Sequence, residues 1–326
     1  MSTRVGIIGT GFIAESHATA MRSVPALELA GVFDLSTAAG EAFARKWGAT
    51  AYADLGALLA DVDAVIVCTP NDTHVGMGEK ALAAGCHLLQ EKPMALSAAD
   101  GERLRVAYDD AGLCLLVGHT HRHSDYAKTV KDVVASGRIG QVRSARIAIT
   151  GGWIWGAWQA WVLDPARSGG HAFHNGVHLY DLARWWLEEP ITQVMAHGQR
   201  LTSAALEFDD YLVATLMTAS GATAVCEISR GEKPKTTSVF EIVVHGSEGT
   251  LLRTWSSEGF VSFSEDGAGP RPVAASDPFA AQLRVFADGI AGQDVEPDAR
   301  DAVHATAVAE AVMRSAVSGR VEEVVA

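Results

Sequence analysis

A glycine-rich turn near the start of the chain has the residue types and the spacing of a phosphate-binding loop. The sequence GTGFIA at residues 9–14 follows an apolar stretch at residues 5–8. Gly9 permits a tight turn from strand to helix, Gly11 lets the backbone approach a pyrophosphate, and small Ala14 allows the helix to pack closely. The first turn of that helix presents free N–H groups to phosphate oxygens. The turn therefore predicts a site for the pyrophosphate of a dinucleotide.

An acidic residue follows at the distance that such a site requires. A second apolar stretch, residues 29–33, ends on Asp34, which lies 23 residues beyond Gly11. A carboxylate there can accept hydrogen bonds from both ribose hydroxyls of NAD and repels the 2′-phosphate of NADP. Because residues 35–37 contain no Arg or Lys, the sequence favours NAD over NADP. Asp34 could also cap the helix that follows.

Two further segments are rich in histidine. His119, His121 and His123 would share one face of an extended segment, and His174 and His178 would share one face of a helix. Converging histidines can bind zinc and activate water, as in a hydrolase. The chain lacks the eightfold βα repeat of metal-dependent barrel hydrolases. We therefore expect no metal and favour polar substrate recognition.

The elements that must position these residues alternate between apolar strands and amphipathic helices through residue 118. Strands are expected at 63–68, 86–90 and 113–118, with helices near 73–84 and 97–111. This alternation predicts a parallel, doubly wound sheet of the Rossmann type.

The pattern changes from residue 141 onwards. A helix is expected near 125–136, before this change. Beyond it, long alternating stretches predict a mostly antiparallel sheet, and helices are expected near 176–188, 277–292 and 301–317. The strands are expected at 143–150, 211–218, 223–230 and 239–245. The fold class is thus α/β. We expect an NAD-binding Rossmann domain at 1–120 and a substrate-binding and oligomerisation α+β domain at 121–326, with C-terminal helices packing back on the first domain.

The composition limits the class of protein further. The chain has 326 residues, 48% of them hydrophobic, and a formal charge of −13, which argues against nucleic acid or an anionic membrane as partner. No apolar run reaches the roughly 20 residues of a membrane span, and the N-terminus does not resemble a signal peptide, so we expect a cytoplasmic protein. Four isolated cysteines, Cys68, Cys86, Cys114 and Cys226, indicate buried reduced thiols.

The motifs together resemble a known family. Glu91-Lys92-Pro93 follows the strand at 86–90, and ligands of open α/β sheets bind outside the carboxyl ends of the strands. With the glycine turn, Thr69-Pro70-Asn71 and the segment 168–181, this order resembles the glucose-fructose oxidoreductase, inositol dehydrogenase and MocA (Gfo/Idh/MocA) family over essentially the whole chain. The resemblance implies hydride transfer between NAD(P) and a secondary alcohol or carbonyl, usually on a sugar, cyclitol or related polyol.

The resemblance also implies the catalytic residues. Lys92 would lie between nicotinamide and substrate and stabilise negative charge on the reacting oxygen, while His178 would act as general acid or base. The family pattern Asp-x-Gly-x-His is matched by Gly176 and His178, but His174 occupies the aspartate position. An imidazole can replace that carboxylate only as a neutral acceptor or a titrating base, so His174 would assist or tune the proton relay.

The turn and the resemblance imply the binding residues as well. Tryptophans at 153, 155, 158 and 161 could stack on a sugar ring, or pack in the core or at a dimer interface. The residues expected to line the cofactor are Gly9, Gly11, Phe12, Ile13, Asp34, Thr69, Pro70, Asn71, His74, Glu91 and Lys92. Those expected to contact the substrate are Arg122, Trp153, Trp161, His174 and His178.

These observations favour an NAD-dependent oxidoreductase acting on a small sugar, cyclitol or polyol. By resemblance, the protein would associate through the open sheet of its second domain as a homodimer or homotetramer. Two alternatives stay open. One is a redox-neutral glycosidase or isomerase that keeps NAD tightly bound, and the other is a non-enzymatic NAD-binding sensor.

Overall fold

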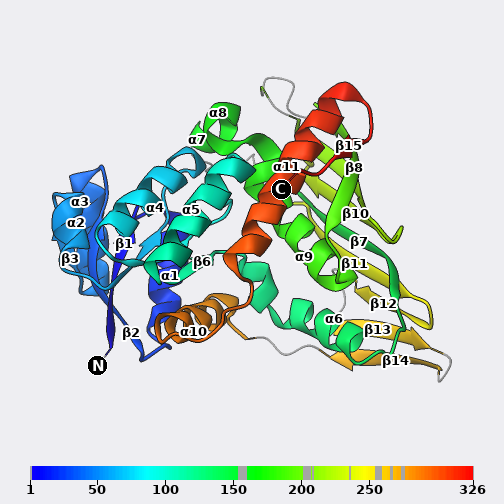
Figure 1. Ribbon diagram of the computed structural model, residues 1–326, viewed down its shortest axis with the longest axis horizontal. Coiled ribbons are helices and arrows are strands. Elements are labelled where there is room, and N and C mark those ends of the chain that lie inside the picture. The colour runs from blue at the N-terminus through cyan, green and yellow to red at the C-terminus, as the bar shows by residue number, and fades with distance from the viewer. Residues whose placement is uncertain are drawn as a thin grey trace. The chain divides into compact units, whose positions relative to one another are not determined.

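The computed structural model describes residues 2–152, 160–200, 207, 209–234, 236–253, 259–264, 267–272 and 276–325 (Figure 1). The chain forms two compact units. Unit 1 comprises residues 1–123 and 276–303, and unit 2 comprises residues 124–275 and 304–326. The chain first passes from unit 1 to unit 2 after residue 123, and it returns to unit 1 for residues 276–303.

Unit 1 contains a six-stranded parallel sheet, which is the doubly wound architecture expected from the alternating pattern. In spatial order the strands are β3 (Thr50–Tyr52), β2 (Leu27–Phe33), β1 (Thr3–Ile8), β4 (Ala64–Val67), β5 (His87–Gln90) and β6 (Leu115–Val117). Its helices are α1 (Phe12–Met21), α2 (Thr37–Trp47), α3 (Leu55–Leu59), α4 (His74–Ala83), α5 (Ala98–Ala111) and α10 (Pro278–Ile290). Because strand order reverses at β1, which lies between β2 and β4, the carboxyl ends of these strands form the switch point at which such folds bind ligands.

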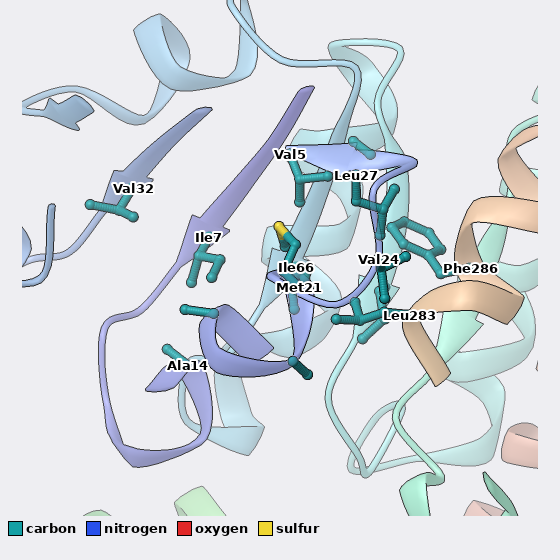
Figure 2. Packing of buried hydrophobic residues seen from close by; sticks show 14 of the residues in the cluster. Val5, Ile7, Ala14, Met21, Val24, Leu27, Val32, Ile66, Leu283 and Phe286 are labelled. Atoms are coloured by element: carbon teal, nitrogen blue, oxygen red, sulfur yellow. The ribbon is translucent and has the colours of Figure 1, made fainter. Parts of the chain in front are cut away.

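Successive residues of the central strands belong to different cores, as expected for a sheet buried on both faces. Val5 and Ile7 belong to the cluster that includes residues of α1 and α10, whereas Ile8 belongs to the opposite one. Figure 2 shows Leu283 and Phe286 of α10 in this first cluster. Residues 276–303 therefore complete the hydrophobic core of unit 1.

Unit 2 is built on a nine-stranded sheet in which β7 and β10 are parallel and the other neighbours are antiparallel. In spatial order the strands are β14 (Gly267–Pro272), β13 (Gly259–Ser264), β12 (Gly249–Arg253), β11 (Ser238–Gly246), β7 (Val142–Gly151), β10 (Thr223–Ser229), β9 (Tyr211–Thr218), β8 (Ile191–Gln199) and β15 (Glu322–Glu323). The mostly antiparallel sheet is thus confirmed, and it contains five strands that the sequence analysis did not identify, namely β8 and β12 to β15.

Helices cover one face of this sheet. The helices of unit 2 are α6 (Asp125–Ala135), α7 (Ala160–Leu163), α8 (Pro165–Ser168), α9 (Val177–Leu187) and the greater part of α11 (Ala299–Ser318). α9 contacts β7 and β10, and it also contacts α6. Along β9, buried residues such as Leu212 and Leu216 alternate with half-buried ones such as Val213 and Met217. This alternation is typical of a sheet with one covered face.

The cysteines are reduced, as expected, but only two of them are fully buried. All four cysteines are free, and Cys86 and Cys226 are buried, but Cys68 and Cys114 are partly exposed. Within the described residues, no helix combines the length and the apolar character needed to cross a membrane.

Candidate active site

The glycine turn adopts a conformation that only glycine accommodates easily. Gly9 has φ +87°, and a Cβ there would lie 2.9 Å from the carbonyl oxygen of Cys68. α1 begins after Gly11, whose position at the helix start has no side-chain cap. Because Ala14 is wholly buried, the first turn of α1 packs closely in the core. The first N–H groups of α1 therefore have no capping side chain and suit phosphate oxygens.

Asp34 is tied to the glycine turn. Its Oδ2 accepts hydrogen bonds from the main-chain N–H (2.8 Å) and the hydroxyl (2.7 Å) of Thr10, and its Oδ1 accepts one from the N–H of Ser36 (2.8 Å). Ser36, rather than Asp34, caps α2, because its Oγ accepts from the N–H of Ala39. Asp34 is therefore held at the carboxyl end of β2, beside the turn.

The apolar side chains beside this turn are not uniformly buried. Phe12 is 85% exposed and Leu35 is 95% exposed, whereas Ile13 is half-buried. Large exposed apolar side chains at a ligand-binding edge suit contacts with a planar ligand.

The loop after β4 is joined to the loop after β5 by His74. The ring is 1% exposed, and its two nitrogens lie 2.9 Å from the carbonyl oxygen of Thr69 and 2.7 Å from that of Pro93. Burial lowers the pKa of His74, although both carbonyl contacts and the charge of Glu91 act in the opposite direction. His74 thus orders the main chain of Thr69 and Pro93, while Thr69 and Pro70 are half-buried and Asn71 is 3% exposed.

Lys92 is half-buried directly after β5, next to the buried Glu91. The two carboxylate oxygens of Glu91 contact His17 (2.7 Å) and the main-chain N–H of Lys92 (3.3 Å). The glycine turn, Asp34, and the loops after β4 and β5 all follow neighbouring strands at their carboxyl ends. The uncapped start of α1 and the narrow space at Gly9 fit a dinucleotide here, with the pyrophosphate at the turn and the ribose at Asp34.

The segment that follows β6 does not have the extended form assumed for its histidines. Residues Thr120–His123 form a 3-10 helix, so His119, His121 and His123 do not lie along one face of a strand. Among the described residues, no group of three or more His, Cys, Asp or Glu side chains is arranged to hold a metal ion.

Arg122, expected to contact the substrate, is buried. Its Nη1 lies 3.2 Å from Oδ2 of Asp301 and 3.7 Å from Oε1 of Glu296, and Arg122 is 3% exposed. The buried ion pair with Asp301 favours a structural role within unit 1.

Two histidines of unit 2, His174 and His178, lie on or next to one irregular segment. Residues Ala172–Gly176, here named the π-turn, form a π-helix that leads directly into α9. His174 lies in the π-turn and His178 in the first turn of α9, and both are half-buried. The ring of His174 meets the ring of Trp161 edge to face, with centroids 5.6 Å apart. π-helical turns in helices frequently occur at functional sites.

The sequence analysis did not identify Asn175, within the π-turn, or its partner Arg230 as site residues. The guanidinium of Arg230 donates a hydrogen bond to Oδ1 of Asn175, which is 5% exposed. Burial lowers the pKa of Arg230 to about 10, so it stays charged near neutral pH. Burial, and then the charge of Arg230, lower the pKa of His171 to about 3. No spacing rule links Arg230 to Asn175, because the two lie 55 residues apart.

Of the four tryptophans at 153, 155, 158 and 161, the structure describes Trp161. Trp161 lies at the end of unit 2 that contains His174. Trp153, Trp155 and Trp158 lie outside the described residues. Asp181, one turn after His178, is 2% exposed.

Two family models match the chain. Residues 3–119 match one described as "Oxidoreductase family, NAD-binding Rossmann fold", and residues 127–252 match one described as "GFO/IDH/MocA C-terminal domain".

Relatives match over nearly the full length. The chain is 29% identical to inositol 2-dehydrogenase of Rhizobium meliloti, covering 98% of both chains. It is 30% identical to inositol 2-dehydrogenase 1 of Saccharopolyspora erythraea, covering 99% of this chain and 97% of the relative. Among solved structures, GenD2 from gentamicin A biosynthesis in complex with NAD is 27% identical, with a TM-score of 0.89, covering 100% of this chain and 97% of that one.

Proposed function

This chain belongs to the Gfo/Idh/MocA family of oxidoreductases, and we propose that it oxidises a secondary alcohol of a sugar, cyclitol or related polyol with NAD, or catalyses the reverse reduction. The observation that carries the proposal is the Gly9 to Ala14 turn with Asp34 beside it, followed at the end of β5 by Lys92. The names of the two inositol dehydrogenases support a cyclitol or similar polyol as the substrate class.

The proposed reaction assigns a task to each residue. When bound, NAD supplies the nicotinamide that accepts a hydride from the carbinol carbon. Lys92 donates a hydrogen bond to the carbinol oxygen and stabilises the negative charge that develops there. His178 takes the hydroxyl proton during oxidation and returns it during reduction, and His174 tunes that transfer.

The pair Asn175 and Arg230 supports the role of His174. Arg230 donates to the amide oxygen of Asn175, the residue that follows His174 in the π-turn. A hydrogen bond from a charged donor restrains the π-turn more strongly than a neutral one. His174 is thus presented from a restrained backbone, as proton transfer between fixed groups requires.

We also propose that the protein forms a homodimer or homotetramer through the open face of the unit 2 sheet. The half-buried residues of β9, among them Val213 and Met217, form part of that face. Apolar side chains there would be covered by the same face of a second copy, as in an isologous interface.

The function is tested by measuring NADH formation with a panel of inositols, sugars, sugar acids and polyols. We expect Lys92→Ala to lower kcat by about 10²- to 10⁴-fold and His178→Asn by a similar factor. Lys80→Ala is the matched control, because Lys80 is an exposed lysine of α4 in the same unit. Equal activity of wild type and Lys92→Ala on every substrate would contradict the proposal.

A further inference from the structure

His17 is a buried histidine on the helix that begins at the glycine turn. Its side chain is wholly buried, and its Nε2 lies 2.7 Å from Oε1 of Glu91. The ring of Phe279 meets it edge to face, with centroids 5.2 Å apart. Nδ1 has no hydrogen-bond partner within the described residues. Burying an imidazole is costly unless it forms a strong hydrogen bond. For His17, that hydrogen bond is the one to Glu91.

Glu91 is a buried carboxylate rather than a carboxylic acid. It is 5% exposed. Burial raises the pKa of Glu91, but the hydrogen bond from His17 and the charges of His17, Lys92 and His74 outweigh burial, so the pKa lies below its usual value. The charged carboxylate therefore depends on His17 as a hydrogen-bond donor.

The same carboxylate contacts Lys92. Oε2 of Glu91 accepts the main-chain N–H of Lys92 at 3.3 Å, and the lysine charge helps to lower the pKa of Glu91. Gly118, directly after β6, leaves room for this arrangement, since a Cβ there would lie 3.0 Å from Oε2. Oε2 therefore lies between the main chain of Gly118 on one side and the main-chain N–H of Lys92 on the other.

We propose that His17 and Glu91 are positioning residues that hold Lys92 in register with the glycine turn. His17 lies on α1, five residues after its first residue Phe12, and Glu91 immediately precedes Lys92. Their hydrogen bond connects the helix that receives the pyrophosphate to the strand end that presents the lysine. The inference rests on the proposed function, which gives Lys92 its catalytic role.

This arrangement predicts a loss of rate without a matching loss of affinity. The phosphate contacts at the start of α1 do not depend on His17, whereas the placement of Lys92 does. A misplacement of a catalytic group by about 1 Å can cost about 100-fold in rate. The role of His17 is thus separable from cofactor binding.

Three variants of the full chain test the inference. His17→Leu removes the donor but leaves the Glu91 charge buried without it, which destabilises the folded protein. The double variant His17→Leu/Glu91→Gln removes donor and charge together, and His17→Gln retains an N–H of similar reach. Tyr108→Phe is the matched control, because it removes another buried hydrogen bond of unit 1, from Tyr108 to the carbonyl of Gly78 at 3.1 Å.

We expect kcat for NADH formation to fall about 100-fold in the double variant, well beyond any loss of affinity for NAD that follows from changing Glu91, a residue expected to line the cofactor. His17→Gln should recover at least about tenfold of that loss, and Tyr108→Phe should retain the wild-type kcat. The second measurement needs no turnover. Labelling of Lys92 by an amine-directed reagent, measured by peptide mass spectrometry without added NAD, should be at least about threefold faster in the double variant, because the neighbouring carboxylate charge is gone.

A folded double variant with the wild-type kcat or with unchanged labelling of Lys92 would overturn the inference. A loss of NAD affinity equal to the loss of kcat would overturn it as well, because it would indicate a general defect of unit 1. If the wild type forms no NADH with any polyol, the proposed function fails instead, and the labelling of Lys92 then decides the inference by itself.

Discussion

Asp34 orders the glycine turn and, in the proposed function, also binds the ribose of the cofactor. Three hydrogen bonds reach it, two from Thr10 and one from the N–H of Ser36. An ionised carboxylate offers about four acceptor positions, so it retains capacity for a ribose hydroxyl. We therefore propose that the choice between NAD and NADP depends on this side chain, which the glycine turn itself holds in place.

We predict that Asp34→Asn weakens NAD binding by about tenfold and reduces discrimination against NADP, because a neutral amide forms weaker hydrogen bonds and does not repel a 2′-phosphate. The measurement is the Kd for both nucleotides by calorimetry. Thr10→Val separates the two roles of Asp34, since it removes one donor to the carboxylate but keeps its charge. Unchanged nucleotide preference in Asp34→Asn would exclude a ribose contact.

The candidate site residues that the sequence suggests most readily are those whose geometry depends on the local chain. Gly9, Gly11 and Asp34 could be identified because a turn, a helix start and a strand end are each encoded within a few residues. The contact between His17 and Glu91 spans 74 residues of sequence, and no periodicity marks it. The ion pair of Arg122 with Asp301 likewise depends on the return of residues 276–303 to unit 1.

At the scale of elements, the π-turn and α9 depend on one glycine. A Cβ at Gly176 would lie 2.5 Å from Oη of Tyr180, a fully buried side chain one turn further along. Such a contact forces either the aromatic ring or the helix start to move. His178 lies between these two residues, so its position depends on the absence of a side chain at residue 176.

We expect Gly176→Ala to destabilise the protein by about 1–3 kcal/mol and to lower kcat, as overpacking displaces the start of α9. Urea denaturation measures the first effect. Gly76→Ala in α4 is the control, because a Cβ there meets nothing within 4 Å and should stabilise the helix slightly. Equal stabilities of Gly176→Ala and wild type would show that Tyr180 yields without cost.

Element prediction was least accurate at two irregular helical segments, the 3-10 helix after β6 and the π-turn before α9. The strand expected at 113–118 is only Leu115–Val117, and the next residues form a 3-10 helix rather than an extended segment. By contrast, the helix expected near 176–188 is confirmed by α9, which runs over Val177–Leu187. The π-turn before it was not predicted, because its register depends on packing against residues such as Arg230.

At the scale of the whole molecule, stability should depend on two histidines of unit 2, the buried His171 and the half-buried His304. Burial, and then Arg230, lower the pKa of His171 to about 3, and burial, and then Arg184, lower that of His304 to about 4. His304 also accepts a hydrogen bond from the N–H of Ile191 at 3.1 Å, which requires a neutral Nε2. Both groups bind protons more readily in the unfolded chain, whose histidine pKa is 6.5.

The free energy of unfolding should therefore be highest above pH 6.5 and fall as the pH decreases toward the folded pKa values. Each histidine contributes a loss of about 2 kcal/mol between pH 6.5 and 5. Urea denaturation across this range measures the slope, and His304→Gln, which can still accept from Ile191, should reduce it. A free energy that stays constant between pH 7 and 5 would contradict the buried neutral state.

Association is a second property of the whole molecule. If the open face of the unit 2 sheet joins two copies, Val213→Glu should shift the protein toward the monomer, because charge would be buried at an apolar interface. Light scattering after size exclusion measures the mass. Val106→Glu, on an exposed position of α5 in unit 1, is the control. A monomeric wild type, or an oligomer unaffected by Val213→Glu, would exclude this interface.

The most direct test of the central claim is to denature the purified protein, identify any released nucleotide, and measure whether added NAD exchanges and accumulates as NADH with a polyol. The account predicts free exchange and stoichiometric conversion of polyol to ketone with NADH, lost in Lys92→Ala. Tightly held, non-exchanging NAD with substrate turnover but no accumulation of NADH would contradict it and indicate a redox-neutral glycosidase or isomerase.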